Sequence, residues 1–332
     1  MAVLITGGAG FIGSHTCVEL MQRGENIVLL DNYANSDPLT PTLIRKIVGR
    51  DFSSYHADMR DEASLCEIFE REDIESVVHF ASLKAVGESV EEPLLYYENN
   101  IGGTLCLLKV MERYGCRSIV FSSSATVYGE TDIIPFVEGA PTSATNPYGW
   151  CKVMIERMLA DICRADERWS AILLRYFNPI GAHSSALIGE NPLGIPNNLV
   201  PYIMKVASGE LPYLEVFGDD YPTPDGTGVR DYIHVCDLAE GHVDALIYAR
   251  AHRGAEEINL GSGWGYSVLD VLHACERAVG NSIPYVISQR RAGDVPEMLA
   301  SVNKAKELLG WATHRSLDDM CESSWRYYSA AK

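Results

Sequence analysis

The stretch that most constrains the fold of this chain stands at the start of the sequence, AVLITGGAGFIG at residues 2–13. Residues 2–6 are apolar or β-branched, a pattern that predicts a short strand buried on both faces. Gly7, Gly8, Gly10 and Gly13 follow, and the residues after them have helical periodicity. A strand, a glycine turn and a helix in this order form the context that a dinucleotide-binding fingerprint requires.

Each glycine of this turn has an expected role in holding a dinucleotide. Gly7 and Gly8 let the chain turn tightly. Gly10 has no Cβ, so a pyrophosphate can lie against its backbone, and Gly13 lets the helix pack closely on the strand. The free N–H groups of the first helical turn then face the phosphates.

An acidic residue supports the same interpretation. A second buried strand is expected at residues 26–30, and Asp31 follows it, 18 residues after Gly13. A carboxylate at this place accepts hydrogen bonds from the adenosine ribose hydroxyls. Asn32 and Tyr33 come next rather than Arg or Lys, so a 2′-phosphate would meet a negative charge with no cation to balance it. The pattern therefore favours NAD over NADP.

Strands and helices alternate through the first half of the sequence. Further strands are expected at residues 52–57, 76–81, 118–123 and 170–176, and helices at 43–48, 62–71, 99–114 and 147–164. This alternation predicts an α/β fold with a doubly wound parallel sheet of the Rossmann type, because each crossover must return over a face of the sheet.

The second half of the chain has shorter elements and is richer in Gly, Pro and Asn. Helices are expected at residues 199–208, 235–250, 267–279, 303–309 and 317–328, with a strand near 258–260. We expect residues 1–177 to form the dinucleotide-binding domain and residues 178–332 a smaller α/β substrate-binding lobe. The chain is expected to re-enter the first domain around residues 235–260.

Composition narrows the classes of function. The formal net charge of -18 disfavours nucleic acid and anionic membranes as partners. No run of 18 apolar residues predicts a membrane span, and a core strand starting at residue 2 leaves no room for a signal peptide. Nine scattered cysteines without a C-x-x-C pair favour reduced thiols and a cytoplasmic location. The nine histidines are dispersed, so no metal site is expected.

The second informative stretch is Tyr148-Gly149-Trp150-Cys151-Lys152, at the start of an expected helix. Tyr148 and Lys152 are four residues apart and share one helix face. A lysine ammonium near a phenol lowers the phenol's pKa, and oxidised nicotinamide would lower it further, so Tyr148 could take a proton from a substrate hydroxyl. Ser124 is expected at the carboxyl end of a parallel strand, where ligands bind in such sheets, and could hydrogen-bond the same hydroxyl.

Together these motifs resemble those of the extended short-chain dehydrogenases/reductases, and longer blocks resemble the UDP-glucose 4-epimerase family among them. The blocks are LKAVGESV at 83–90, FSSSATVYG at 121–129, LLRYFNPIGAH at 173–183, GIPNNLVPYI at 194–203 and DGTGVRDYIHV at 225–235. They run in the family's order over nearly the whole chain.

The resemblance implies a role for each matching residue. Tyr148 would be the acid/base, Lys152 its partner and a ligand of the nicotinamide ribose, and Ser124 a second group on the substrate hydroxyl. The NAD site would be lined by Gly7, Gly10, Phe11, Ile12, Gly13, Asp31, Asn32, Asn35, Ser36, Asp58, Met59, Phe80, Ala81, Lys84, Asn99 and Phe177. The UDP-sugar would be held by Lys84, Asn178, Asn198, Leu199, Phe217, Arg230, Arg291, Asp294 and Met298. The two arginines suit a diphosphate, which needs guanidinium partners on an acidic protein.

The implied reaction interconverts UDP-glucose and UDP-galactose in galactose metabolism. Tyr148 removes the proton from O4 while hydride passes from C4 to tightly held NAD. The flat 4-keto sugar then turns about its link to UDP, and hydride returns to the other face. The resemblance also implies a homodimer joined through the helices at 99–114 and 147–164, although the sequence alone could equally bury both helices against the sheet.

Three points remain open in the sequence. A nucleotide-sugar 4,6-dehydratase shares the fold and first step, but such enzymes place an Asp-Glu pair where this chain has Ala125 and Thr126. A non-catalytic NAD-sensing protein would be expected to lose Tyr148 and Lys152. Met298 stands where the family has a gatekeeper of the sugar pocket, and its intermediate bulk leaves acceptance of UDP-N-acetylhexosamines undecided.

Overall fold

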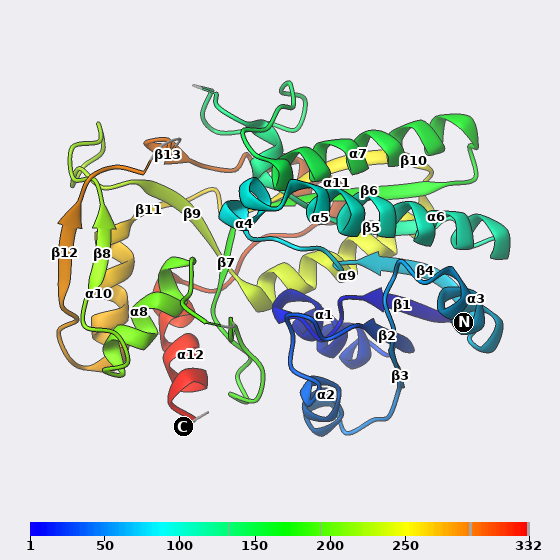
Figure 1. The fold of residues 1–332 in the computed structure, drawn as a ribbon, viewed down its shortest axis with the longest axis horizontal. Coiled ribbons are helices and arrows are strands. Elements are labelled where there is room, and N and C mark those ends of the chain that lie inside the picture. Colours follow the sequence, from blue (N-terminus) through cyan, green and yellow to red (C-terminus); the bar gives the residue numbers. More distant parts are fainter. Residues whose placement is uncertain (132, 193, 292–293, 331–332) are drawn as a thin grey trace.

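The computed structural model describes residues 1–131, 133–192, 194–291 and 294–330 (Figure 1). Its central layer is a seven-stranded sheet in the order β10-β6-β5-β4-β1-β2-β3, and every neighbouring pair is parallel. The strands are β1 Ala2–Thr6, β2 Ile27–Asp31, β3 Ser53–His56, β4 Ile74–His79, β5 Ser118–Ser124, β6 Ser170–Tyr176 and β10 Gly254–Leu260. This arrangement confirms the predicted doubly wound α/β fold.

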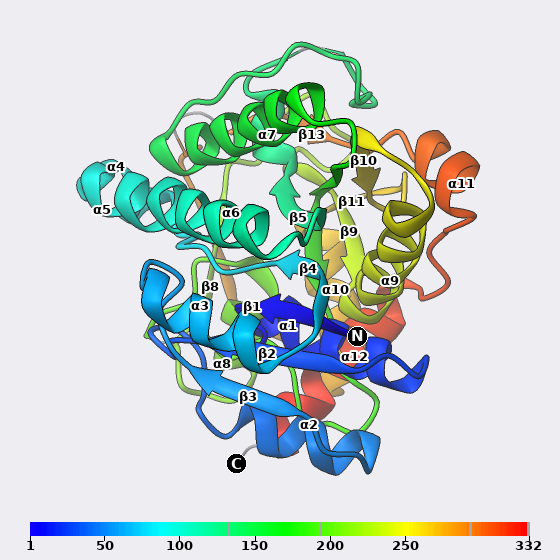
Figure 2. The ribbon, with the colours of Figure 1, turned by 90° about the vertical axis from the view of Figure 1, so that its right-hand side faces the viewer.

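Helices cover both faces of this sheet, so its central strands are largely buried. Every residue of β2 and β6 is buried. One apolar core lies between the sheet and the helices α1 Phe11–Gln22, α2 Thr40–Val48 and α9 Val235–Ala251. The other lies under α3 Glu62–Arg71, α6 Gly103–Tyr114 and α7 Pro147–Ala165 (Figure 2).

The second lobe has its own smaller core (Figure 1). A four-stranded sheet contains β7 Asn178–Ile180, β9 Val229–His234, β11 Gly265–Ser267 and β13 Glu297–Met298, and β8 Leu214–Phe217 pairs with β12 Tyr285–Ser288. Its helices are α8 Leu199–Ala207, α10 Val268–Val279 and α12 Leu317–Ala330. The chain returns to the large sheet through α9 and β10, and α11 Asn303–Leu309 packs on both of them.

Several expectations need small corrections. The fourth strand ends at His79 rather than at residue 81, because the N–H groups of Phe80 and Ala81 turn out of the strand and donate to the carbonyl of Thr6. The helix expected at 99–114 begins as a π-helix, Tyr97–Gly102, before α6. Two short helices, α4 Val86–Glu91 and α5 Pro93–Tyr96, were not predicted.

The apolar residues of α6 do not form one buried stripe. Leu108 and Met111 are buried against the sheet, whereas Leu105 is 42% exposed. No helix in the described part of the chain is both long and apolar enough to cross a membrane.

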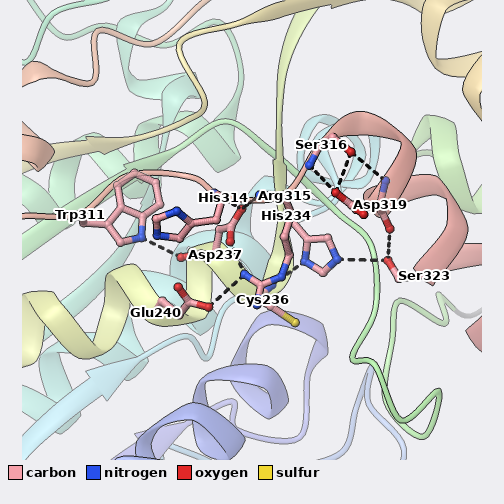
Figure 3. Close-up of polar contacts among 10 residues, drawn as sticks. All are labelled: His234, Cys236, Asp237, Glu240, Trp311, His314, Arg315, Ser316, Asp319 and Ser323. Atoms are coloured by element: carbon pink, nitrogen blue, oxygen red, sulfur yellow. Dashed lines mark hydrogen bonds and ion pairs between the residues drawn. The ribbon is translucent and has the colours of Figure 1, made fainter.

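A polar cluster at the start of α9 joins the two lobes (Figure 3). The fully buried carboxylate of Asp237 accepts hydrogen bonds from the backbone N–H groups of His314 and Arg315, each at 3.1 Å, and pairs with the Arg315 guanidinium. His234 contacts the Ser323 hydroxyl of α12 at 3.1 Å between Nε2 and Oγ. The Asp237 contacts attach the segment between α11 and α12 to the start of α9, and the His234 contact attaches α12 there.

Candidate active site

The glycine turn between β1 and α1 has the geometry that the sequence predicts for a phosphate site. Gly7 has φ +71°, and a Cβ on it would lie 2.7 Å from the backbone nitrogen of Ala81. Gly10 is the N-cap of α1 and has no side chain to cap the helix, so the N–H groups of the first turn at Phe11 and Ile12 stay available to an anion.

Two glycines act differently from the expectation. A Cβ on Gly13 would lie 2.3 Å from the carbonyl oxygen of Gly7, so Gly13 lets α1 pack on the turn itself rather than on the strand. A Cβ on Gly8 would lie 2.8 Å from Cγ of Leu29, so Gly8 rather than Gly13 provides the close approach to a strand, here β2. The reason is that the first turn of α1 folds back over the glycine turn that precedes it.

Asp31 at the end of β2 is tied to this turn. Its Oδ2 accepts a hydrogen bond of 2.9 Å from the backbone N–H of Ala9. Its Oδ1 accepts from the N–H of Tyr33 at 2.9 Å and from the Ser36 hydroxyl at 2.8 Å. The structure therefore brings Asp31 and Ser36 to the glycine turn, while Asn35 on the same loop is exposed.

Asn32 and Asp58 form a second group beside Asp31. The side-chain amide of Asn32 donates to Oδ2 of Asp58 at 3.1 Å. The Arg60 guanidinium also donates to this carboxylate and is the main cause of an Asp58 pKa well below its usual range. Met59 is buried, and a Cβ on Gly103 would lie 2.5 Å from its Cε.

The segment after β4 carries further predicted residues. Phe80 and Ala81 lie beside the glycine turn through their bonds to Thr6. Asn99, in the π-helix, donates to Oδ1 of Asn100 at 2.9 Å. The Asn100 side chain in turn accepts from the N–H of Leu83 at 2.8 Å and donates to its carbonyl at 3.0 Å, which fixes the loop before Lys84. Asn100 was not predicted, although its neighbour was, and π-helical turns are frequent at functional sites.

Ser124, Tyr148 and Lys152 come together where β5 ends and α7 begins. The Ser124 hydroxyl lies close enough to the Tyr148 phenol to lower its pKa. The ammonium of Lys152 donates to the carbonyl of Ser122 at 2.7 Å, and its Nζ lies 5.6 Å from the centre of the Tyr148 ring. Between the pair, Trp150 is 38% exposed, whereas Cys151 is fully buried and its thiol contacts the Tyr96 carbonyl.

The protonation of this group differs from the expectation. Burial raises the pKa of Tyr148 to about 12, and the nearby Ser124 hydroxyl opposes this only in part. Burial also lowers the pKa of Lys152 to about 8. The chain alone therefore does not show the predicted lowering of the phenol's pKa by Lys152, because the ammonium is directed to the Ser122 carbonyl and desolvation dominates both groups.

The two predicted arginines, Arg230 and Arg291, and the residues next to them lie in the second lobe. Nη2 of Arg230 on β9 lies 3.8 Å from Oδ1 of Asp294, and Met298 on β13 is the strand partner of Arg230. The guanidinium carbon of Arg291 lies 3.9 Å from the centre of the Phe217 ring at the end of β8. Arg230 is mostly buried and Arg291 is exposed.

The remaining predicted residues lie at the junction of the lobes. Asn198 precedes α8, which begins at Leu199, and donates to Oε1 of Glu190 at 2.7 Å. Nζ of Lys84, from the first lobe, lies 3.5 Å from the same oxygen. Glu190 was not predicted, because nothing in its local sequence indicates that it joins these two side chains.

The side chains of two predicted residues at the junction already make contacts within the protein. Asn178 donates to the backbone carbonyl of Asp231 at 2.9 Å. Phe177 is buried, with its ring 6.1 Å from that of Phe136. Among the described residues, no cluster of His, Cys, Asp and Glu is arranged to hold a metal ion.

Comparisons with known proteins agree with this geometry. The family model described as "NAD dependent epimerase/dehydratase family" matches residues 3–261. A curated relative from Neisseria gonorrhoeae named UDP-glucose 4-epimerase is 57% identical over 330 residues, which covers 99% of this chain and 98% of the relative.

Solved structures give the same result. A UDP-glucose-4-epimerase from Stenotrophomonas maltophila, with bound NAD and formylated UDP-arabinopyranose, is 48% identical with a TM-score of 0.98, covering 100% of this chain and 98% of that one. A UDP-glucose 4-epimerase from Bifidobacterium longum in complex with NAD+ and UDP is 50% identical with a TM-score of 0.95, covering 99% of this chain and 98% of that one.

Proposed function

The chain belongs to the NAD dependent epimerase/dehydratase family, and from this premise we propose that it is an isomerase that interconverts UDP-glucose and UDP-galactose with tightly bound NAD. One observation carries the proposal. The side chains of Ser124 and Tyr148 lie close together at the carboxyl end of β5, and the ammonium of Lys152, bonded to the Ser122 carbonyl, lies beside the Tyr148 ring. This group can take a proton from a sugar hydroxyl and return it.

The residues of the first lobe fit NAD. The uncapped first turn of α1 offers N–H groups to a pyrophosphate, and the close contacts around Gly7 leave the turn no room for side chains. Asp31 uses three hydrogen bonds on its two oxygens, and a carboxylate has about four acceptor sites, so one remains for a ribose hydroxyl. When bound, NAD supplies reversible hydride acceptance at the sugar C4 and, when oxidised, a positive charge near the phenol.

The chain's own residues handle the proton and the orientation. Tyr148 accepts the proton of the sugar O4, Ser124 hydrogen-bonds the same oxygen, and Lys152 binds the nicotinamide ribose. The arginines Arg230 and Arg291 pair with the diphosphate, which holds the nucleotide firmly. The sugar is held loosely, so the 4-keto form can turn about its link to UDP and present its other face.

Asn178, Asn198, Leu199, Phe217 and Asp294 complete the UDP-sugar site in this proposal. Met298 adjoins Arg230 on the neighbouring strand and is partly buried, so its bulk sets the room near the sugar. We propose that the flexible Met side chain also admits UDP-N-acetylhexosamines. Met298→Tyr is then expected to reduce turnover of UDP-N-acetylglucosamine more than turnover of UDP-galactose, and equal effects on both would contradict this part.

The direct test is incubation of the purified protein with UDP-galactose and no added NAD, followed by measurement of UDP-glucose. Conversion supports the proposal with retained cofactor, whereas a 4-keto-6-deoxy sugar would indicate a dehydratase and bound NAD without turnover a sensor. Tyr148→Phe should abolish conversion and keep NAD. The control Tyr55→Phe changes a hydroxyl that contacts Glu72 far from the site and should convert normally.

We also propose a homodimer formed through the outer side of α4 to α7, helices that lie side by side (Figure 2). Apolar side chains are exposed on all four helices: Val90 61%, Leu94 80%, Leu105 42%, Trp150 38% and Met154 42%. Leu105→Glu combined with Met154→Glu should give a monomer in light scattering. The control Ile247→Glu, an exposed apolar residue of α9, should leave the mass unchanged. The nine free cysteines suit a reducing compartment such as the cytoplasm.

A further inference from the structure

A buried ion pair lies one helical turn beyond Lys152. Glu156 on α7 and Arg175 on β6 form two hydrogen bonds, Nε to Oε1 at 2.9 Å and Nη2 to Oε2 at 2.6 Å. Their side chains are only 7% and 3% exposed. Tyr148, Lys152 and Glu156 follow one another at intervals of four residues, so they share one face of the helix.

Three consecutive serines at the end of β5 each contact one residue of this face. The carbonyl of Ser122 accepts from Lys152 at 2.7 Å, and the hydroxyl of Ser123 donates to Oε1 of Glu156 at 2.5 Å. Ser124 lies beside Tyr148. Along β5, the contact of Ser123 with Glu156 therefore lies between the contact to Lys152 and the contact to Tyr148. It fixes the register of α7 on β5.

The remaining guanidinium nitrogen of Arg175 also has hydrogen-bond partners. Nη1 of Arg175 donates to the Tyr128 hydroxyl at 3.2 Å and to the Glu138 carbonyl at 3.0 Å. The Tyr128 hydroxyl donates to Oδ1 of Asn259 on β10 at 2.6 Å. A buried ion pair often contributes little net stability, because desolvation of both charges offsets their attraction. The location of the pair next to the proposed acid/base residues indicates a role other than stabilising the fold.

We propose that Glu156 and Arg175 are positioning residues of the reaction: Glu156 holds Lys152 as an ammonium ion in register with Tyr148, and Arg175 limits the negative charge that Lys152 experiences. This inference rests on the proposed function, in which Lys152 must be charged to bind the nicotinamide ribose and to favour the Tyr148 phenolate. Neither residue touches the substrate, so both act through Lys152.

The charges around Lys152 determine the sign of the expected effects. Burial lowers its pKa to about 8, and Cys151 and Glu156 of α7 oppose this. From β4, His79 also faces Lys152, and burial together with the lysine's charge lowers the His79 pKa to about 3, so this histidine is neutral. From β5, the Ser122 carbonyl and the Phe121 ring, whose centre is 4.9 Å from Nζ, complete the surroundings. Glu156 is thus the carboxylate that acts on Lys152.

Two single substitutions should therefore move the pKa of Lys152 in opposite directions. Glu156→Gln removes the carboxylate and leaves the Arg175 cation, so the Lys152 pKa should fall by about one unit, a tenfold loss of ammonium relative to amine. Arg175→Met leaves Glu156 without its partner, so the Lys152 pKa should rise. A purely structural role predicts loss of stability in both variants with no such opposite shifts.

The experiment titrates protein labelled with ¹³C at the lysine ε-carbon by NMR, with the Lys152 signal assigned from Lys152→Met. In parallel, the pH profile of kcat is measured with UDP-galactose. Asp161→Asn is the matched control, since it removes an exposed ion pair with Arg157 on the same helix and should move neither readout. If a single variant does not fold, the double variant Glu156→Gln, Arg175→Met leaves neither member of the ion pair charged and should still lower the Lys152 pKa.

The proposal is supported if the Lys152 pKa shifts in opposite directions in the two single variants and the alkaline limb of the kcat profile shifts in the same direction as the Lys152 pKa. Shifts of the same sign, or a lower kcat with an unchanged Lys152 titration, overturn it. If wild-type protein does not convert UDP-galactose, the proposed function fails, and the positioning role fails with it. The NMR titration would then still report whether Glu156 sets the charge of Lys152, so the two failures are distinguishable.

Discussion

The buried histidine His242 predicts a specific loss of stability in mild acid. It lies on α9 with no exposed surface, and its ring centre is 4.8 Å from that of Phe80 and 5.4 Å from that of Tyr176. Its Nδ1 donates to the Leu238 carbonyl at 2.8 Å, while Nε2 is buried with no partner among the described residues. Burial lowers its pKa from 6.5 to about 4, so the folded protein keeps this ring neutral.

The magnitude follows from proton linkage. Between pH 6.5 and about 4 the unfolded chain binds a proton at His242 and the folded chain does not, so the free energy of unfolding falls as the pH falls. Each pH unit in this window costs about 1.4 kcal/mol. Relative to neutral pH, His242 alone should therefore remove about 1.4 kcal/mol at about pH 5.5. Above pH 6.5 the contribution is fully present.

His242→Phe tests this reasoning, because it keeps an aromatic ring in place and removes the titration. Urea unfolding is measured at about pH 7.5 and about pH 5.5, at one protein concentration and with the same excess of NAD. Wild-type protein should lose about 1.4 kcal/mol more than the variant between the two pH values. The control Leu246→Met changes a fully buried side chain of the same helix and should lose as much as wild type. Equal losses in wild type and His242→Phe would refute the argument.

Three further substitutions test other parts of the structure. Gly13→Ala places a Cβ against the glycine turn and should weaken NAD binding at least about tenfold in a fluorescence titration. Asp31→Asn directs an amide donor at a buried N–H such as that of Ala9, so we expect a loss of about 1–3 kcal/mol and weaker NAD binding, and an unchanged melting temperature would contradict this. Arg315→Met removes the cation beside buried Asp237; it should cost about 2–3 kcal/mol in urea unfolding, less than for a wholly buried pair because the arginine is 35% exposed.

The large sheet was predictable because most of its strands are continuous apolar or β-branched runs and its helices are long enough to show a helical period. The strand at 170–176 and the helix at 62–71 were predicted with the bounds that the structure has. The fourth strand was placed two residues late, since Phe80 and Ala81 are as apolar as the strand but turn toward the Thr6 carbonyl. Strands of two to four residues in the second lobe, such as β13 Glu297–Met298, are too short for any period.

The part of the candidate site that was predictable is the part in which the sequence spacing of the residues determines which side chains lie close together. A spacing of four residues from Tyr148 to Lys152 on a helix, and a serine at the end of a parallel strand, suffice to bring these side chains together. Glu190 was not predictable, because its contacts with Lys84 and Asn198 join segments that only the folded lobes bring together.

Arg175 was open to prediction on one ground that the sequence offered. It is the single charge in SAILLRY, a strand of otherwise apolar or small residues and one tyrosine, and such a charge needs a buried partner. Glu156, one turn after Lys152 on the neighbouring helix, was the available carboxylate.

The protonation state of Tyr148 is a property of the site that residue spacing does not determine. The interval of four residues gives proximity, but the effect of a charge also depends on what surrounds both groups. Here burial favours the neutral form of each, raising the Tyr148 pKa to about 12 and lowering that of Lys152 to about 8. Near neutral pH Tyr148 is therefore a neutral phenol, while Lys152 is still mostly an ammonium ion. In the proposed function, the positive charge of the oxidised cofactor would favour the phenolate, so the base would form in the complex in which hydride can also be accepted.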